Sequence, residues 1–220
     1  MKAVIESSIR LATAGLLAAA FATAAANTLP AIPPKAAQVT GPIQQVELGP
    51  VFADRYLCVE HALELEYAGD ALGTDCVLSG GVEIGRNGYL KLYRTDGTTN
   101  ADWYGWHADV LAPFDGTVVY LHHDTQENAP GVLGPSSAAG SLRFRNGDGV
   151  IVTYVHVSRI AVKIGDRVKA GQVVAKLGNN GQTRAPGIHI GAYREADAMP
   201  LQIRWDLRAM AKKRAEAGVR

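Results

Sequence analysis

The stretch of residues 153–193 most strongly constrains the fold, because apolar and polar residues alternate through it and glycines interrupt the alternation. Residues 162–174 read VKIGDRVKAGQVV, which is typical of a strand, a tight turn and a second strand. His156 lies in a short apolar run before this segment, and His189 lies in another run after it. Two histidines on neighbouring strands can form a metal or an acid–base site, so this stretch is the first candidate for chemistry.

Size and composition indicate one β-rich domain. The chain has 220 residues, of which 47% are hydrophobic and 20% charged, and this is enough to bury one core. Its 24 glycines and short apolar runs favour a β-dominated fold over a helical bundle. The net charge is only +1, which argues against a nucleic-acid binder that relies on a general positive field. We therefore expect no nucleic-acid partner.

The N-terminus has the pattern of an export signal. Lys2 and Arg10 precede an apolar run at 11–21, and small residues follow up to Ala26. This order is typical of a signal peptide over residues 1–26 with an Ala-x-Ala cleavage site. A membrane-spanning helix is the less favoured alternative, because the run is short and rich in alanine. We predict export to the periplasm or the extracellular space, with no transmembrane segment in the mature chain.

Two segments separate the signal peptide from the main domain. Residues 27–50 contain five prolines and no periodicity, which indicates a Pro-rich linker or an extended arm. Residues 51–92 are predicted to form an N-terminal β extension. Within it, residues 63–67 alternate like a strand, and Asn-Gly at 87–88 is typical of a hairpin turn.

Cys58 and Cys76 are the two cysteines of the chain. In an exported protein a single pair is expected to form a disulfide, which would contribute about 3 kcal/mol through the loop that it closes. A zinc-binding pair is the competing interpretation, but the spacing does not match a zinc knuckle. We predict a Cys58–Cys76 disulfide in the β extension and assign His61, close to Cys58, a structural role.

Residues 93–205 are predicted to form the main domain. Two strands joined by an Asp-Gly turn are expected over 110–121 and a hairpin over 142–157, and a short basic helix is expected within 206–220. Stretches without strand periodicity separate these elements, and a long loop of this kind is usually functional or mobile. Three loops are expected to form the walls of a groove: residues 95–108, 124–141 and 178–188.

Four motifs of this domain follow one another in order: VLAPFDGTV at 110–118, YVHVS at 154–158, the glycine-interrupted segment at 162–174 and GNNG at 178–181. Over about residues 93–195 they resemble the lysostaphin/LytM-type zinc metallopeptidases, which cut peptide crosslinks in bacterial cell walls. Lipoyl and biotinyl carrier domains share a similar hybrid motif. Those carriers need a modifiable lysine at a hairpin tip, and the GNNG motif offers none.

The resemblance implies a set of site residues. The family binds zinc through a histidine, an aspartate four residues later and the second histidine of a His-x-His motif. On this pattern Asp102 and His189 are metal ligands, and His156 is the catalytic strand histidine. Two positions depart from the family motifs: Thr98 stands at the first zinc histidine, and Gly187 stands at the first histidine of His-x-His.

The departures predict zinc binding that is weak or absent. A catalytic zinc normally has three protein ligands and one water, and a threonine hydroxyl is a poor substitute for an imidazole. The imidazole missing at Gly187 removes a donor to the developing oxyanion, which is typically worth about 3–4 kcal/mol of barrier. Asn100 and His107 are alternative sources of a third ligand. For each of the residues implied by the resemblance, a structural role as a solvated or packed side chain is the less favoured alternative.

The expected fold is all-β, a duplicated hybrid motif whose antiparallel sheets form an open groove, with a short C-terminal helix. The groove is expected to bind its substrate through Trp103, Trp106, Asn179 and Asn180, although both tryptophans can equally pack under their loop. The expected function is that of an exported pseudoenzyme that acts on peptidoglycan. Its groove would bind stem peptides or a cell-wall enzyme partner. The alternative is an active zinc endopeptidase with an unrecognised third ligand.

Overall fold

The computed structural model describes residues 28–63, 65–81 and 90–218. The expected signal peptide and the expected turn at 87–88 lie outside these residues, and both stay predictions. In the described part of the chain, no helix has the length and apolar character needed to cross a membrane.

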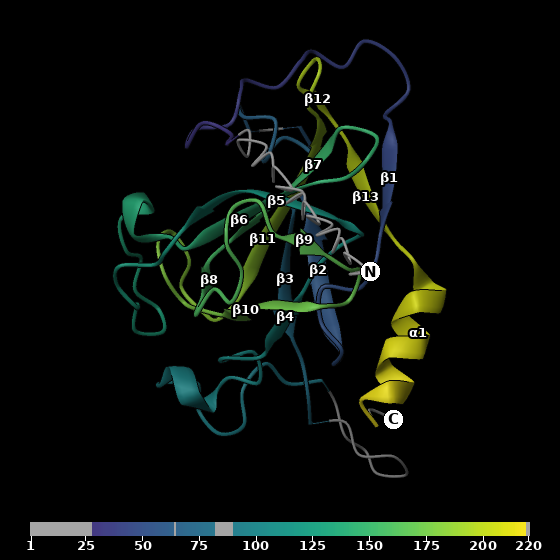
Figure 1. The fold of residues 1–220 in the computed structure, drawn as a ribbon. Helices are drawn as coiled ribbons and strands as arrows, with labels where there is room; N and C mark the ends of the chain where they lie inside the picture. Colours follow the sequence, from purple (N-terminus) through teal and green to yellow (C-terminus); the bar gives the residue numbers. More distant parts are fainter. Residues whose placement is uncertain (1–27, 64, 82–89, 219–220) are drawn as a thin grey trace, which may run out of the picture.

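The chain folds into antiparallel β-sheets followed by one short helix, which confirms the predicted fold class (Figure 1). The main sheet consists, in spatial order, of β2 (Tyr56–Glu60), β3 (Thr74–Leu78), β11 (Ile188–Arg194), β7 (Val150–Val155), β6 (Ser141–Arg145), β5 (Gly116–His122) and β9 (Arg167–Val168). Outside this order, β12 (Met199–Pro200) pairs with β11. A smaller sheet consists of β4 (Asp109–Leu111), β10 (Val173–Leu177) and β8 (Val157–Ser158).

The segment expected to be a linker or an arm lies against the fold at both of its ends. Its last part is β1 (Gln45–Leu48), which pairs in parallel with β13 (Gln202–Trp205). Its first part is tied to the main sheet, because the guanidinium of Arg143 donates to the carbonyls of Pro30 and Ala31. Residues 28–50 therefore form an extended arm that closes on strands from the middle and the end of the sequence.

The predicted basic helix is present as α1 (Leu207–Glu216). It begins after Asp206, whose carboxylate accepts the backbone N–H groups of Arg208 and Ala209, as expected of an N-cap. Figure 1 shows α1 leaving the end of β13, at the side of the molecule where β1 lies.

The local predictions for strands have mixed outcomes. The hairpin over 142–157 is confirmed by β6 and β7. Residues 110–121 do contain two strands, but β4 pairs with β10 whereas β5 pairs with β6 and β9, so they form no hairpin. The predicted strand at 63–67 is wrong for its described residues, since only Tyr67 pairs, through one bridge to Lys35. Its apolar residues Leu63 and Leu65 are exposed, so their alternation does not mark a buried face.

The core lies between the main sheet and the smaller sheet. Strand residues that alternate in sequence point to the same face, which brings the buried apolar residues of both sheets together. The largest of these buried side chains are Tyr154, Phe52, Phe144, Leu48, Leu142, Leu177, Ile188 and Ile190. A second, smaller cluster consists of Ala68, Val119, Ile151 and Tyr193.

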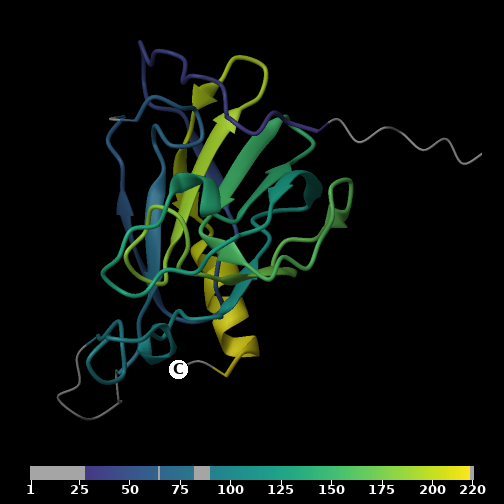
Figure 2. The same ribbon diagram turned by 90° about the vertical axis from the view of Figure 1, so that its left-hand side faces the viewer.

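Three asparagines join the three predicted loops. Asn100 donates through Nδ2 to the carbonyl of Asn128 at 2.7 Å, and Asn179 donates to Oδ1 of Asn100 at 2.8 Å. Asn128 in turn donates to the carbonyl of Gly181 at 2.8 Å. The loops therefore meet, although the segment around the 3₁₀ helix η1 (Asn100–Asp102) projects from the sheets in both views (Figure 2).

Candidate metal and catalytic site

The Cys58–Cys76 disulfide is present, which confirms the prediction. Cys58 and Cys76 face each other across β2 and β3, so the bond holds the register of these two strands. In this register Val59 lies opposite Asp75. Because a slip of one residue would turn every side chain to the other face, the disulfide also determines which residues share a face with Asp75.

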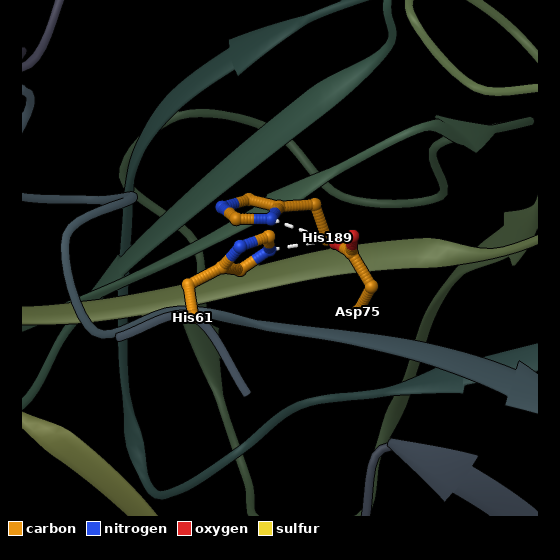
Figure 3. A group of neighbouring side chains, drawn as sticks. All are labelled: His61, Asp75 and His189. Carbon is orange, nitrogen blue, oxygen red and sulfur yellow. Dashed lines mark hydrogen bonds and ion pairs between the residues drawn. The ribbon is translucent and has the colours of Figure 1, made fainter. Parts of the chain in front are cut away.

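Three side chains converge on the face that this register creates. Asp75 of β3 lies directly opposite His189 of β11, and Asp75 Oδ1 is 2.9 Å from His189 Nδ1. His61 comes two residues after Val59, which places it diagonally across from Asp75. Its Nε2 is 3.3 Å from Asp75 Oδ2. Figure 3 shows both imidazoles directed at the one carboxylate.

These three residues, which we call the His61 cluster, have the geometry of a candidate metal centre. One possible ligand atom from each residue lies within 4.8 Å of the other two. His189 is buried, His61 is partly buried and Asp75 is exposed. The cluster therefore opens to solvent on the side of Asp75.

The second nitrogen of His189 is held from the opposite side by residues 67–73. His189 Nε2 is 3.0 Å from Asp70 Oδ1 and 3.4 Å from the carbonyl oxygen of Gly69. This segment lies directly on β11, because a Cβ added at Gly191 would come within 1.3 Å of that same carbonyl oxygen. Glycine at this position thus allows the contact that brings Asp70 to His189.

The electrostatics of the cluster follow from these contacts. Burial alone would lower the pKa of His189, but hydrogen bonds to Asp70 and Asp75 and their negative charges outweigh it and raise the pKa to about 9. For Asp75, partial burial acts to raise the pKa, whereas the hydrogen bond and charge of His189 and the proximity of His61 lower it below its usual value. Without a metal, His189 is an imidazolium between two carboxylates.

His156 lies beside the cluster, in a strained turn between β7 and β8. Its φ of +70° is in the left-handed region, which is uncommon for a residue other than glycine and typical of functional sites. His156 Nδ1 is 2.8 Å from the carbonyl oxygen of Asn180, and the carbonyl of His156 accepts the N–H of Gly178. Burial lowers the pKa of His156 to about 4 and outweighs the Asn180 carbonyl, so the ring is neutral at neutral pH.

The other predicted ligand, Asp102, is engaged within its own loop. Its two carboxylate oxygens accept the backbone N–H groups of Thr95 and Gly97. Burial acts to raise the pKa of Asp102, but these N–H groups lower it overall. In the described ranges no hydrogen bond or ion pair joins Asp102 to His189. Their joint role as metal ligands stays a prediction, and the structure does not bring the two together.

Neither departure from the family motif provides a replacement ligand in the described structure. Thr98 is exposed, and its hydroxyl donates to Asp96 at 2.8 Å. Gly187 is buried, and a Cβ added there would lie 3.2 Å from a methyl group of Val77. Position 187, where the resemblance leads one to expect a histidine, is therefore closely packed.

The alternative ligands of the 95–108 loop have other contacts. The side-chain amide of Asn100 is bonded to Asn128 and Asn179. His107 stacks on Trp106 with ring centroids 4.0 Å apart, and its Nε2 is 3.7 Å from a carboxylate oxygen of Glu127.

The four predicted groove residues fall into two pairs. Asn179 and Asn180 are fully buried, and Asn180 donates to the carbonyl of Val157, so they hold the loops from inside. Trp103 and Trp106 are half-buried, and Trp103 Nε1 donates to the carbonyl of Gly97. The two tryptophans thus remain the candidates for direct contact with a ligand.

Known proteins resemble this chain in sequence. The model of peptidase family M23 matches residues 102–200. Glycyl-glycine endopeptidase ALE-1 of Staphylococcus capitis is 50% identical over 36 residues, which are 16% of this chain. The chain spans about a tenth of the length of this curated relative, since the match covers 10% of it.

Three solved structures are similar to this chain over part of its length. The catalytic domain of the antimicrobial peptidase lysostaphin from Staphylococcus simulans is 23% identical, with a TM-score of 0.32, and the match covers 53% of this chain and 77% of that one. The deep-sea M23 metalloprotease pseudoalterin is 14% identical, with a TM-score of 0.40 and coverage of 74% and 75%. A chain of the SpoIIQ–SpoIIIAH pore-forming complex is 29% identical, with a TM-score of 0.33 and coverage of 42% and 53%.

Proposed function

Through residues 102–200 this chain belongs to peptidase family M23, and we propose that it is an exported protein that binds the peptidoglycan of the bacterial cell wall. In this proposal its zinc-dependent hydrolysis is weakened or lost. Stem peptides, or a cell-wall enzyme partner, bind to the surface formed by the three joined loops.

One observation supports the proposed loss of hydrolysis. Asp102 uses both carboxylate oxygens to hold its own loop, while the other family positions carry an exposed threonine, Thr98, and a buried glycine, Gly187. The position of the first zinc histidine therefore offers only a hydroxyl, which is a poor zinc ligand. The donor that would stabilise a developing oxyanion at Gly187 is missing as well.

Export is supported by the disulfide. Such bonds form and persist in oxidising compartments such as the periplasm and the extracellular space, and are rare in the cytosol. The Cys58–Cys76 bond lies between strands of the main sheet and is part of the folded structure. This agrees with the signal peptide expected over residues 1–26.

Co-sedimentation with purified peptidoglycan tests the proposed binding. We expect the full chain to sediment with peptidoglycan and to release no soluble fragments. Trp106→Ala should weaken binding about tenfold, because loss of one stacking aromatic residue typically costs about 1–3 kcal/mol in a binding site. Leu207→Ala, at an exposed position of α1, is the matched control. A chain that stays in the supernatant at all protein concentrations contradicts the proposal.

A second function, that of an active zinc endopeptidase, is favoured by the His61 cluster, whose three donors include two from outside the family match. Zinc, when bound, supplies Lewis-acid chemistry to a peptide carbonyl. In this chain the neutral imidazole of His156 is the nearby group suited to hold or accept a proton. Release of soluble fragments from peptidoglycan that stops with a chelator would establish this function in place of the first.

A further inference from the structure

We propose that the outer edge of β2 is a docking surface for a second copy of this chain, with the two β2 strands paired antiparallel about Cys58. β2 is an edge strand of the main sheet, and among the strands that the structure describes it pairs with β3 alone. The inference goes beyond the proposed function, because it holds whether or not the protein binds peptidoglycan.

The register of β2 on β3 turns every second residue of β2 outward. In an antiparallel pair, alternate residues direct their backbone N–H and C=O groups at the neighbouring strand. The N–H of Ser79 donates to the carbonyl of Arg55, so the odd-numbered residues of this stretch bond to β3. Cys58 and Cys76 lie opposite each other with Cα atoms 4.1 Å apart, as expected of a pair without such bonds. The groups that point outward belong to the even-numbered residues Tyr56, Cys58 and Glu60.

These outward backbone groups are available to a partner. In the part of the chain that the structure describes, no hydrogen bond reaches them. A hollow of about 360 Å³ borders the strand on its core side, with Tyr56, Glu60 and Trp205 among its lining residues. A row of unpaired N–H and C=O groups is a template for another strand. Its hydrogen-bonding chemistry therefore selects an extended strand as the partner.

The side chains of this edge favour association. The side chains of Tyr56 and Cys58 pack against the core, so those of Leu57 and Val59 point away from it, and they are 47% and 72% exposed. β2 contains no lysine or proline, which commonly protect edge strands. The opposite edge strand of the sheet, β9, has only two residues, of which Arg167 is exposed. The edge at β2 is thus the one suited to add a strand.

A second β2 strand is complementary to the first. In an antiparallel pairing about Cys58, the even-numbered residues of both strands meet, so the outward groups of each copy bond to those of the other. Leu57 then lies opposite Val59 of the second copy, an apolar cross-strand pair that the symmetry repeats. Glu60 lies opposite Tyr56 of the second copy, so no like charges of the two strands meet. A two-fold axis at Cys58 satisfies both strands, as an interface between identical copies requires.

This pairing places both His61 clusters on one side of a continuous sheet. Val59 lies opposite Asp75, so Leu57, Val59 and the cluster share a face of β2 and β3. The two-fold axis of an antiparallel strand pair is perpendicular to the sheet and keeps this face on the same side in both copies. The dimer therefore presents two clusters to the same surface, which makes contact with an extended polymer bivalent.

Sedimentation equilibrium of the untagged, disulfide-bonded chain tests the pairing. We expect a reversible monomer–dimer equilibrium between micromolar and millimolar concentrations, because a five-residue edge gives an interface below about 1,200 Å². Val59→Lys should weaken dimerisation at least about tenfold, since it changes both symmetry-related pairs with Leu57. Val173→Lys is the matched control and should leave dimerisation unchanged, because Val173 is 43% exposed on β10, a strand with neighbours on both sides.

Two results overturn the proposal. One is a wild-type chain that stays monomeric over the whole range of concentration, and the other is dimerisation of Val59→Lys as strong as that of the wild type.

Hydrogen exchange measured by NMR tests the pairing in the wild-type chain, without any variant. As the dimer forms, exchange should slow at the amides of Tyr56, Cys58 and Glu60 and stay unchanged at those of Leu57 and Val59, which already bond to β3. This alternation is specific to strand pairing. A dimer that slows exchange elsewhere and leaves the even-numbered amides of β2 unchanged contradicts the proposal.

A pair of cysteine variants tests the register. Leu57→Cys and Val59→Cys chains, mixed and oxidised, should form a covalent dimer, whereas neither variant alone should do so, because position 57 lies opposite position 59 of the second copy. The new thiols lie on the face of the sheet opposite to Cys58. A covalent dimer from one variant alone, in the yield of the mixture, overturns pairing about Cys58. None of these readouts involves peptidoglycan, so failure here is distinct from failure of the proposed binding function.

Discussion

Asp102 and Asp75 are two aspartates with opposite surroundings. Asp102 lies in a loop that projects from the sheets, and its oxygens accept N–H groups from residues five and seven positions earlier. Asp75 lies in the main sheet, and its oxygens contact His61 and His189, which are 14 and 114 positions away in the sequence. The sequence motif pointed to Asp102, whereas the convergence of side chains occurs at Asp75.

The difference shows where metal-binding capacity comes from in this fold. Each carboxylate oxygen of Asp102 accepts one N–H group of its own loop, and among the described residues no histidine nitrogen forms a hydrogen bond or ion pair with it. Adjacent strands, by contrast, bring side chains from distant parts of the chain onto one face, and the register decides which of them meet. The His61 cluster depends on three strands and a disulfide, so it should be sensitive to changes that leave the Asp102 loop intact.

Removal of the disulfide should have the largest effect. The Cys58→Ala/Cys76→Ala double variant loses a crosslink between residues 18 positions apart, which costs about 3 kcal/mol of unfolding free energy. It also frees the register of β2 against β3, so affinity for Co²⁺ should fall together with stability. Urea unfolding and Co²⁺ titration measure the two effects.

If the double variant lost stability and kept its full metal affinity, the cluster would not depend on the disulfide. Strand pairing alone would then be sufficient to position His61 against Asp75. The single variant Cys58→Ala is less informative, since it leaves an unpaired thiol at the buried Cys76.

The dependence of the unfolding free energy on pH should reveal the titration of His156, which lies beside the His61 cluster. The pKa of His156 is lowered from 6.5 to about 4 in the folded chain, so between these values the unfolded chain binds more protons. Stability should therefore be fully present above pH 6.5 and fall as the pH drops towards 4, by about 3 kcal/mol in total. His189 lowers the pKa of His156 by its charge, whereas Asp75 and Asp70 raise it.

The measurement is urea unfolding of the metal-free chain between about pH 4 and pH 7, for the wild type and for His156→Asn. Asparagine tolerates the left-handed backbone at this position and can still donate to the carbonyl of Asn180. The difference between the two stability curves should grow with pH up to about 6.5. Parallel curves would show that His156 is not held neutral by burial.

Much of the fold follows from local sequence patterns. The hairpin over 142–157 and the C-terminal helix were predictable because the alternation, the turn residues and the capping Asp206 all lie close together in sequence. The alternation of apolar and polar residues at 63–67 led to a wrong prediction of a strand, since its leucines are exposed. Which sheet β4 and β5 join was not predictable, because pairing partners are set by packing far along the chain.

The site was less predictable than the fold. His189 and His156 were found through motifs, but the sequence carries no motif linking His61 to Asp75 or Asp70. The two cysteines did carry information about which residues face each other. Once Cys58 and Cys76 are taken as a directly opposed pair of neighbouring antiparallel strands, Asp75 must lie opposite Val59, with His61 diagonal to it. The contact with His189 then depends on the pairing of β3 with β11, which only the folded structure shows.

A glycine variant should give a moderate effect confined to the cluster. A Cβ at Gly191 would lie 1.3 Å from the carbonyl oxygen of Gly69, so Gly191→Ala must push residues 67–73 away from β11. We expect a loss of about 1–3 kcal/mol in unfolding free energy. We also expect a metal affinity lowered to that of Asp70→Asn, since both changes remove the carboxylate from His189.

The matched control is Gly147→Ala, where an added Cβ meets no atom within 4 Å. Its stability and metal affinity should stay within error of the wild type. Equal metal affinity in Gly191→Ala and the wild type would show that the contact between Asp70 and His189 does not support the site.

The smallest effect is expected for substitution of Asp102, the aspartate that was compared with Asp75. Asp102→Asn replaces one acceptor oxygen by an amide NH₂ group, so one of the N–H groups of Thr95 and Gly97 loses its partner. Hydrogen exchange measured by NMR should become faster at the amide that loses its partner and stay unchanged at the amides of β3 and β11. Global stability should change little, because among the described residues the Asp102 carboxylate bonds only N–H groups of its own loop. Faster exchange in β3 or β11 would instead show that the loop and the His61 cluster are coupled, and Asp102 would then regain a role in the site.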